Sequence, residues 1–278
     1  MCATCGCSDD RTGRVTTIAE PHGADGVPAH EHGPGHGPGH GHDHTPGPDH
    51  VHPVPVPPAP VSRLQRLEID ILAKNDRLAD ANRERLRERG VVALNLMSSP
   101  GSGKTTLLVR TLHELAGELP VAVVEGDQET QLDAERIHAT GAPVVQVNTG
   151  AGCHLDAQMI SEAIDRLDPA SGSLLFVENV GNLVCPAAFD LGESAKVVVI
   201  AVTEGDDKPS KYPQMFACAD LLIVNKIDLL PYVDFDVDAC VARAREVNPG
   251  LEVLTLSATT GAGLEEWCAW LRRSAVSS

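Results

Sequence analysis

Aromatic residues, long apolar runs and net positive charge are all scarce in this sequence of 278 residues. Phe, Trp and Tyr make up 3% of the residues whereas 42% are hydrophobic, so a core must be built mainly from Val, Leu, Ile and Ala. No apolar run reaches the roughly 20 residues of a transmembrane helix, and no secretory signal is visible at the N-terminus. The formal net charge of -17 argues against nonspecific binding to nucleic acid or to an anionic membrane. We therefore expect a cytoplasmic protein with no nucleic-acid or membrane partner.

The first 60 residues have almost no large apolar side chains. They hold nine of the twelve histidines and eleven of the twenty prolines. Such a segment cannot bury enough surface to offset its chain entropy, so we predict a disordered tail over residues 1–60 and a globular domain over residues 61–278. Leucines and isoleucines recur near helical spacing between Ser62 and Arg89, which predicts an amphipathic helix at the start of that domain.

From residue 91 onward, short β-rich runs alternate with helical patterns. This alternation of unbroken apolar strands and helices predicts an α/β fold with a mostly parallel sheet covered by helices on both faces. Ligands should then gather at the carboxyl ends of the strands. The expected strands are 91–97, 120–125, 143–147, 173–178, 196–202, 220–224 and 251–256, and the expected helices are 104–117, 130–140, 155–167, 211–218, 236–247 and 262–273.

A glycine-rich stretch lies between the first expected strand and the first expected helix. It has the context of a Walker A phosphate-binding loop, in which backbone N–H groups and a helix N-terminus bind phosphate oxygens. Lys104 should reach the β- and γ-phosphates, and the Thr105 hydroxyl should bind Mg2+. The loop departs from the consensus at its first glycine, which is Ser98 here. The residues expected to line the nucleotide are Pro100, Gly101, Ser102, Gly103, Lys104, Thr105 and Thr106.

The motif Asn225-Lys226-Ile227-Asp228 follows the strand at 220–224 and is typical of a guanine site. A carboxylate such as Asp228 can accept hydrogen bonds from N1–H and N2–H of guanine, which adenine does not offer, while the Lys226 stem lies along the base. Ser257 and Ala258, which follow the last strand, are expected to form a second base-contacting loop. The pair of motifs favours GTP over ATP.

Two acidic residues are candidates for the phosphate end of the site. Glu178 ends an apolar strand and should hold Mg2+ through water, and the N–H of Gly181 could approach the γ-phosphate. Asp127 could bind the metal ion or position the attacking water, although a helix cap or a solvated loop residue is the alternative for either carboxylate. Lys104, Asp127 and Glu178 are therefore the candidate catalytic residues. No arginine or glutamine stands out as a hydrolytic residue, so we expect slow turnover by the protein alone.

Eight cysteines in a cytoplasmic chain suggest thiols or metal ligands rather than disulfides. Cys2, Cys5 and Cys7 could wrap one ion with the terminal amine, as square-planar Ni2+ or tetrahedral Zn2+. The neighbouring histidine tract suits storage of nickel, zinc or copper ions. Cys153 and His154 are a poor chelate alone, but two copies across a two-fold axis would supply four ligands.

The remaining cysteines divide into one candidate ligand and three core residues. Cys185 follows the expected switch loop, where nucleotide state could move a thiol, although each such cysteine taken singly is better explained as structural. Cys218, Cys240 and Cys268 lie in helical patterns among apolar neighbours and are predicted to be core residues.

Taken together, these motifs resemble the HypB family, the nickel-insertion GTPases of [NiFe]-hydrogenase maturation. The matching stretches are Cys2 to Cys7, the His-rich linker, the phosphate loop, 125–127, 153–156, 178–186, 203–209 and the guanine motif. The resemblance implies a dimerising GTPase that uses GTP and Mg2+, with a tight nickel site at Cys2, Cys5 and Cys7. It also implies a weaker Ni2+ or Zn2+ site at Cys153, His154 and Cys185.

The same resemblance implies partners: a second copy of the chain, a small zinc-binding HypA-like protein and the hydrogenase large subunit. Lys208 is implied to contact nucleotide across the dimer. The leading hypothesis is thus a GTP-gated nickel metallochaperone. The alternatives are a nickel or zinc store with a regulatory GTPase domain, and a metal GTPase that serves another nickel or cobalt enzyme.

Overall fold

The computed structural model describes residues 62–127, 132–150 and 152–276. The predicted tail over residues 1–60, with its ligand candidates Cys2, Cys5 and Cys7, lies outside these described residues.

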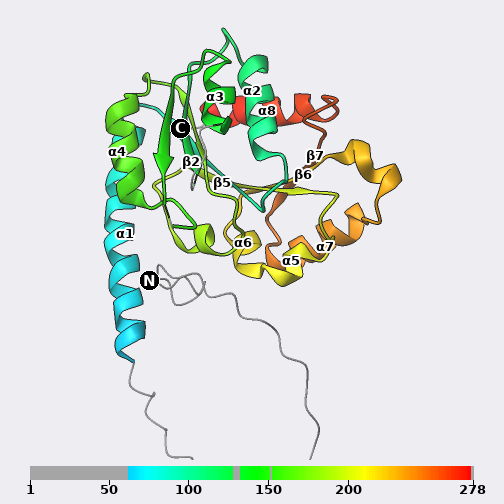
Figure 1. The fold of residues 1–278 in the computed structure, drawn as a ribbon, viewed down its shortest axis with the longest axis horizontal. Coiled ribbons are helices and arrows are strands. Elements are labelled where there is room, and N and C mark those ends of the chain that lie inside the picture. Colours follow the sequence, from blue (N-terminus) through cyan, green and yellow to red (C-terminus); the bar gives the residue numbers. More distant parts are fainter. Residues whose placement is uncertain (1–61, 128–131, 151, 277–278) are drawn as a thin grey trace, which may run out of the picture. The chain divides into compact units, whose positions relative to one another are not determined.

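Seven strands form one parallel sheet in the described part of the chain, in the order β3-β2-β4-β1-β5-β6-β7. The sheet lies between helices (Figure 1). The central strands are mostly apolar and are buried on both faces, which is the pattern of a parallel sheet covered on both sides. All seven predicted strands are present within a residue or two of their expected bounds. The strands are β1 (Val92–Ser98), β2 (Val121–Asp127), β3 (Val144–Asn148), β4 (Leu174–Glu178), β5 (Ala195–Ala201), β6 (Leu221–Asn225) and β7 (Glu252–Thr255).

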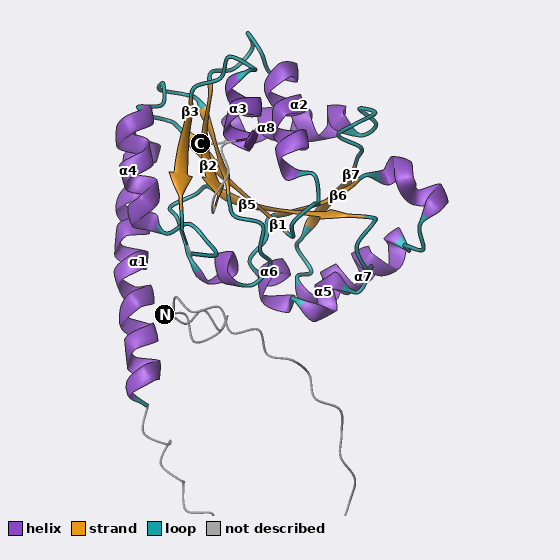
Figure 2. Ribbon diagram, in the orientation of Figure 1, coloured by secondary structure: helices purple, strands orange, loops and turns teal. Residues whose placement is uncertain are grey.

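Helices cover both faces of this sheet (Figure 2). One face packs against α2 (Lys104–Glu114), α3 (Leu132–His138) and α8 (Leu264–Val276) around the buried Phe176 and Trp267. The other face packs against α1 (Arg63–Glu88) and α4 (Ala157–Leu167) near β2 and β4, and against α6 (Pro213–Ala217) and α7 (Val237–Val247) near β5 and β6. The predicted α/β class is therefore confirmed.

Some elements differ from the sequence-based expectation. The single helix expected at 211–218 is instead two short ones, α5 (Lys208–Lys211) and α6, which meet at Tyr212. Pro213 has no N–H to continue the first helix, so it starts a new one instead. Two 3-10 helices, η1 (Cys185–Ala188) and η2 (Ile227–Tyr232), were not expected. Cys240 and Cys268 are buried as predicted, whereas Cys218 is only half-buried and donates to the Met215 carbonyl.

Helix α1 lies beside α4 and is tied to two loops of the domain (Figure 1). Asn75 accepts a hydrogen bond from the Ala157 N–H at 2.9 Å and donates to the Asp190 carbonyl at 2.7 Å. Asn82 donates to the carbonyls of Ala157 and Leu191 at 2.8 and 3.1 Å. These buried amides link the start of α4 to the segment that precedes β5. Among the helices that the structure describes, none is long and apolar enough to cross a membrane.

Candidate nucleotide and metal site

A cavity of about 560 Å³ opens at the carboxyl ends of β1, β2 and β4. Its wall brings the predicted phosphate loop together with both acidic candidates and with one residue of the guanine motif. It is lined by Ser98, Ser99, Pro100, Gly101, Ser102, Gly103, Lys104, Thr105, Thr106, Glu125, Gly126, Asp127, Asp133, Arg136, Glu178, Asn179, Val180, Gly181 and Lys226.

The conformation of the phosphate loop explains why one consensus glycine is dispensable. Gly101 and Gly103 adopt φ values of 77° and 91°, which favour glycine, and a Cβ on Gly103 would lie 2.7 Å from Asn225 Nδ2. Ser98 has no such constraint, because Asp168 and Lys226 are the non-glycine residues with positive φ in the described chain. Ser98 is buried at the end of β1, and its hydroxyl donates to the Ser99 carbonyl.

Glu178 contacts Lys104 and Thr105, the two side chains that are expected to bind the phosphates and the magnesium ion. Its Oε1 atom accepts from Thr105 Oγ1 at 2.6 Å and from Lys104 Nζ at 3.2 Å. The Lys104 side chain is 10% exposed and that of Glu178 3% exposed, so the ion pair is largely shielded from solvent. The Lys104 ammonium group is thus held at the base of the phosphate loop by Glu178.

Glu125 faces Glu178 across neighbouring strands, since their Cα atoms pair in the register of β2 and β4. Burial, together with the charges of Glu178 and Asp127, raises the pKa of Glu125 to about 7. Glu125 Oε2 and Glu178 Oε2 are both buried without a hydrogen-bond partner among the described residues. Together with the Thr105 hydroxyl they form an all-oxygen donor set, which is the set that Mg2+ prefers. These residues therefore fit a magnesium ion.

The guanine motif is braced against the phosphate loop. Asn225 donates to the Ser102 carbonyl at 2.9 Å and accepts from the Ala258 N–H at 3.1 Å. Lys226, in the left-handed region with φ of 64°, donates to the Gly101 carbonyl at 2.6 Å. Asn225 thus joins three loops, as its position in the motif suggested. Of the other base-site candidates, Asp228 is the second residue of η2, and the Ser257 hydroxyl accepts from the Thr260 N–H.

Two contacts in this region have no counterpart in the sequence-based expectations. Arg136 of α3 lines the cavity and donates to Thr106 Oγ1 at 3.2 Å. Ser99 of the phosphate loop donates to Glu204, which also pairs with Lys208 at 3.3 Å. Lys208 therefore sits near the phosphate loop within its own chain, and its expected contact across a dimer stays a prediction. No local motif marks these residues, because α3 and the 204–208 turn carry no phosphate-loop pattern.

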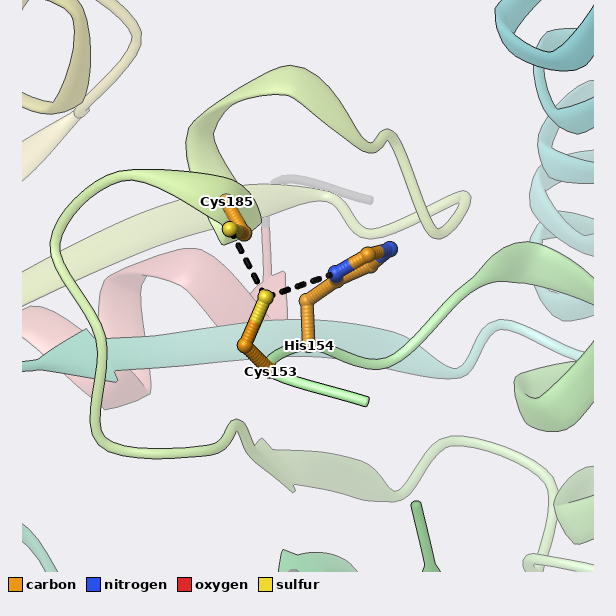
Figure 3. A group of neighbouring side chains, drawn as sticks. All are labelled: Cys153, His154 and Cys185. Carbon is orange, nitrogen blue, oxygen red and sulfur yellow. Dashed lines mark hydrogen bonds between the residues drawn. The ribbon is translucent and has the colours of Figure 1, made fainter. Parts of the chain in front are cut away.

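Cys153, His154 and Cys185 come together although they belong to different loops (Figure 3). The first two lie between β3 and α4, and Cys185 begins η1 after the loop that leaves β4. The Cys153 thiol donates to the Cys185 sulfur at 2.8 Å, and 3.7 Å separates Cys153 Sγ from His154 Nδ1. One possible ligand atom from each residue lies within 4.8 Å of the others, which is close enough for a single ion.

The surroundings of His154 suit a metal ligand. Burial lowers the pKa of His154, so its imidazole is neutral at pH 7 and keeps a lone pair for a metal. Its ring stacks on Phe189 with 3.9 Å between the centroids, which holds the ring from one side. Two thiols and an imidazole form a soft donor set that suits nickel or zinc rather than magnesium.

A lysine and a threonine that open a helix beside a phosphate-sized cavity, at the ends of parallel strands, place this chain among the P-loop nucleotide-binding proteins. A family model described as "CobW/HypB/UreG, nucleotide-binding domain" matches residues 92–255. "Hydrogenase maturation factor HypB" of Azotobacter vinelandii is 61% identical over 212 residues, which cover 76% of this chain and 70% of that protein. The chain therefore belongs to the HypB family.

Other relatives and solved structures agree with this assignment. HypB of Escherichia coli strain K12 is 60% identical over 209 residues, 75% of this chain and 72% of that protein. The crystal structure of HypB from Archaeoglobus fulgidus superposes with a TM-score of 0.69 at 43% identity, over 73% of this chain and 99% of that chain. HypB from Helicobacter pylori, solved in complex with nickel, also gives 0.69, at 38% identity over 73% of this chain and 96% of that chain.

Proposed function

We propose that this protein is a GTP-hydrolysing nickel metallochaperone that helps insert Ni2+ into the large subunit of a [NiFe]-hydrogenase. One observation carries the proposal. One member of a soft three-residue ligand cluster, Cys185, lies on the segment whose first residues, Glu178 to Gly181, line the phosphate cavity. A protein that only hydrolysed GTP would have no use for such a cluster at this place. The names of the relatives, hydrogenase maturation factors, point in the same direction.

In this proposal the nucleotide end of the site works as follows. The phosphate loop and Lys104 bind the triphosphate, Asp228 selects guanine, and Asp127 with Glu178 serves the hydrolytic step. A bound Mg2+ would neutralise phosphate charge, held by the Thr105 hydroxyl and the paired carboxylates described above. Hydrolysis gives GDP and phosphate.

Nickel is the cargo of the other end of the site. Three ligands from one chain leave a fourth position open, which suits an ion that must be received and released. That position could be filled by a second copy of the chain, by a small zinc-binding HypA-like partner or by the client. Zn2+ can occupy the same donor set. Cys2, Cys5 and Cys7 are proposed as a second nickel site, and the His-rich tail as a reservoir.

The two ends are proposed to be coupled. The segment from Glu178 to Cys185 borders the cavity at one end and the cluster at the other, so a change at the γ-phosphate can alter the metal geometry. If GTP and GDP change nickel affinity by a given factor, nickel must change the relative affinity for the two nucleotides by the same factor.

The direct test is transfer of radioactive nickel from the full chain to the nickel-free large subunit of a [NiFe]-hydrogenase. We expect transfer with GTP to exceed transfer with GDP, and expect Cys185→Ser to lower it at least tenfold. The half-buried Cys218→Ser is the matched control and should transfer at the wild-type rate. Equal transfer by Cys185→Ser and wild type, or equal transfer with GTP and GDP, would overturn the proposal. A variant without residues 1–60 should keep GTP-dependent transfer, whereas a storage protein would lose its nickel.

A further inference from the structure

A chain of buried polar side chains crosses the domain beneath the two sites. It consists of Asn179, Asn95 and Glu193, which are 1%, 0% and 7% exposed. We call these three residues the amide chain. Asn179 follows β4, Asn95 lies in the middle of the central strand β1, and Glu193 precedes β5. Asn95 pairs in register with Val177 and Lys196, so it lies in the middle of the sheet. An apolar residue would be the less costly choice at such a position.

Every link of the amide chain is a hydrogen bond of ordinary length. Asn179 Nδ2 donates to Asn95 Oδ1 at 3.2 Å, and Asn95 Nδ2 donates to Glu193 Oε1 at 3.1 Å. At one end, Asn179 Oδ1 accepts from the N–H groups of Leu155 and Val180 at 3.2 and 3.0 Å. At the other, Glu193 Oε2 accepts from the N–H of Leu191 at 2.7 Å.

The backbone N–H groups at both ends fix the direction of the whole chain. Because Asn179 Oδ1 faces two N–H donors, its amide nitrogen must point to Asn95. Because Asn95 Oδ1 already accepts from Asn179 Nδ2, Asn95 turns its own nitrogen toward Glu193 Oε1. Each side chain therefore has one orientation that satisfies all of its partners. A buried network of this kind is rigid, since reversal of one amide would bring two acceptors or two donors together.

The ends of the amide chain reach both functional regions. Asn179 lines the phosphate cavity and directly follows Glu178, the residue that holds Lys104 and Thr105. Leu155 directly follows His154 of the metal cluster. At the far end, Leu191 lies two residues beyond Phe189, whose ring stacks on His154. Asn95 itself is not part of the cavity wall or of the cluster.

We propose that Asn95 is a positioning residue which, through Asn179 and Glu193, couples the phosphate cavity to the Cys153–His154–Cys185 cluster. The inference rests on the proposed exchange between nucleotide state and metal affinity, and it names the path of that exchange. When Glu178 and Asn179 shift on nucleotide exchange, the rigid amide chain requires Leu155 or Leu191 to shift with them. Either shift moves His154 or its stacking partner. Without Asn95 the route to Leu191 is cut, and the Asn179 amide loses the acceptor that fixes its orientation, so its bond to the Leu155 N–H is no longer held rigidly.

The experiment is a nickel titration of the full chain in which Cys2, Cys5 and Cys7 are replaced by alanine. Thiolate-to-nickel charge-transfer absorption reports on the remaining cluster, because the histidines of the tail give no such band. Each titration is run with GDP and with a nonhydrolysable GTP analogue. In the parent chain we expect the two Kd values for Ni2+ to differ at least about fivefold. In the Asn95→Ala variant we expect a difference below about twofold, with GTP-analogue affinity in the absence of nickel unchanged.

Asn75→Ala provides the matched control. Asn75 is another buried asparagine, and it joins Ala157 to Asp190 without a bond to Asn179 or Asn95. The Asn75→Ala variant should lose about as much stability as Asn95→Ala. Its Kd values for Ni2+ with GDP and with the GTP analogue should nevertheless differ as much as in the parent chain. If Asn95→Ala does not fold, Glu193→Gln replaces it, because an amide there presents an N–H to one of two donors and breaks one link.

The outcomes separate the two claims. A parent chain with equal Kd values for both nucleotides would overturn the gating in the proposed function and the coupling path with it. If the two Kd values for Ni2+ in Asn95→Ala differ as much as in the parent chain, the path is overturned and the gating stays intact. The same holds for Glu193→Gln where that variant replaces Asn95→Ala. Loss of the ratio in Asn75→Ala as well would also overturn the path, since general loosening would explain it. Loss confined to the amide chain would support it.

Discussion

Glu125 lies in the cavity wall near two other carboxylates, and its negative charge is unfavourable there. Its pKa is about 7 in the folded protein, above the ordinary value of 4.5, because burial and then Glu178 and Asp127 disfavour the anion. A raised carboxyl pKa contributes stability that is fully present below about pH 4.5 and is lost as the pH rises through 7. The ligand-free domain should therefore become less stable over this window.

We predict that Glu125→Gln removes this pH dependence. Between pH 5 and pH 8 the wild type should lose about 2 to 3 kcal/mol of unfolding free energy that the variant keeps. Urea unfolding at the two pH values, without nucleotide and with a chelator, measures the difference. The exposed Glu246→Gln should follow the wild type. Parallel pH profiles for Glu125→Gln and wild type would contradict the prediction.

Asp228 gives a second prediction at this scale, about base selection. Its carboxylate is expected to accept two N–H groups of guanine, whereas an asparagine would present a donor to one of them. Asp228→Asn should weaken GTP binding roughly hundredfold or more and improve binding of xanthosine triphosphate, which carries a carbonyl at that position. Fluorescent nucleotide titrations measure both affinities. Asp234→Asn, an exposed neighbour beyond η2, should bind GTP like wild type; unchanged GTP affinity in Asp228→Asn would place the base elsewhere.

At the scale of elements, the contact of α1 with the segment before β5 depends on one glycine. Gly192 has φ of 88°, and a Cβ there would lie 2.5 Å from the Ala79 carbonyl oxygen and 2.8 Å from the Arg83 nitrogen, both in α1. Gly117 has φ of 77° and nothing within 4 Å of the same position. Alanine substitutions at Gly192 and Gly117 therefore separate the cost of backbone strain from the cost of a clash with α1.

We predict that Gly192→Ala costs about 3 kcal/mol of unfolding free energy and Gly117→Ala about 1 kcal/mol. Both variants force alanine into the left-handed region, and only the first also drives it into α1. Urea denaturation of the two variants measures the difference. Equal losses of unfolding free energy would show that α1 moves away from the added Cβ without an energetic penalty, and that α1 packs loosely on the domain at this point.

Elements were more predictable than the contacts between them. The seven strands could be predicted because each is an apolar run bounded by polar loops, and the phosphate loop because strand, turn and helix are consecutive. The metal cluster was harder, since Cys153 and Cys185 stand 32 residues apart and meet only because of the order β3-β2-β4. Asn95 and Glu193, 98 residues apart, give no local signal at all. An asparagine inside an apolar strand does mark a buried polar partner, but not which one.

At the scale of the whole molecule, the candidate metal cluster is incomplete within one chain. Cys153, His154 and Cys185 offer three donors, whereas a tetrahedral or square-planar ion takes four. Cys185 is buried and the other two residues are half-buried, so the cluster is partly exposed at Cys153 and His154. A second copy that approaches by a two-fold axis would bring an identical cluster to that exposed side, and metal would then favour association.

We predict that a chain with alanine at Cys2, Cys5 and Cys7 dimerises more tightly with Ni2+ than with a chelator, at a fixed nucleotide. Sedimentation equilibrium should show the mass rising from about 29.4 kDa toward twice that value as metal is added. Cys153→Ser should abolish the metal-dependent step, because it removes the central sulfur of the cluster, and Cys218→Ser should retain it. A dimerisation constant that is the same with metal and with chelator would contradict a shared metal site. The fourth ligand would then have to come from solvent or from a different partner, and the cluster would be a transfer site within a single chain.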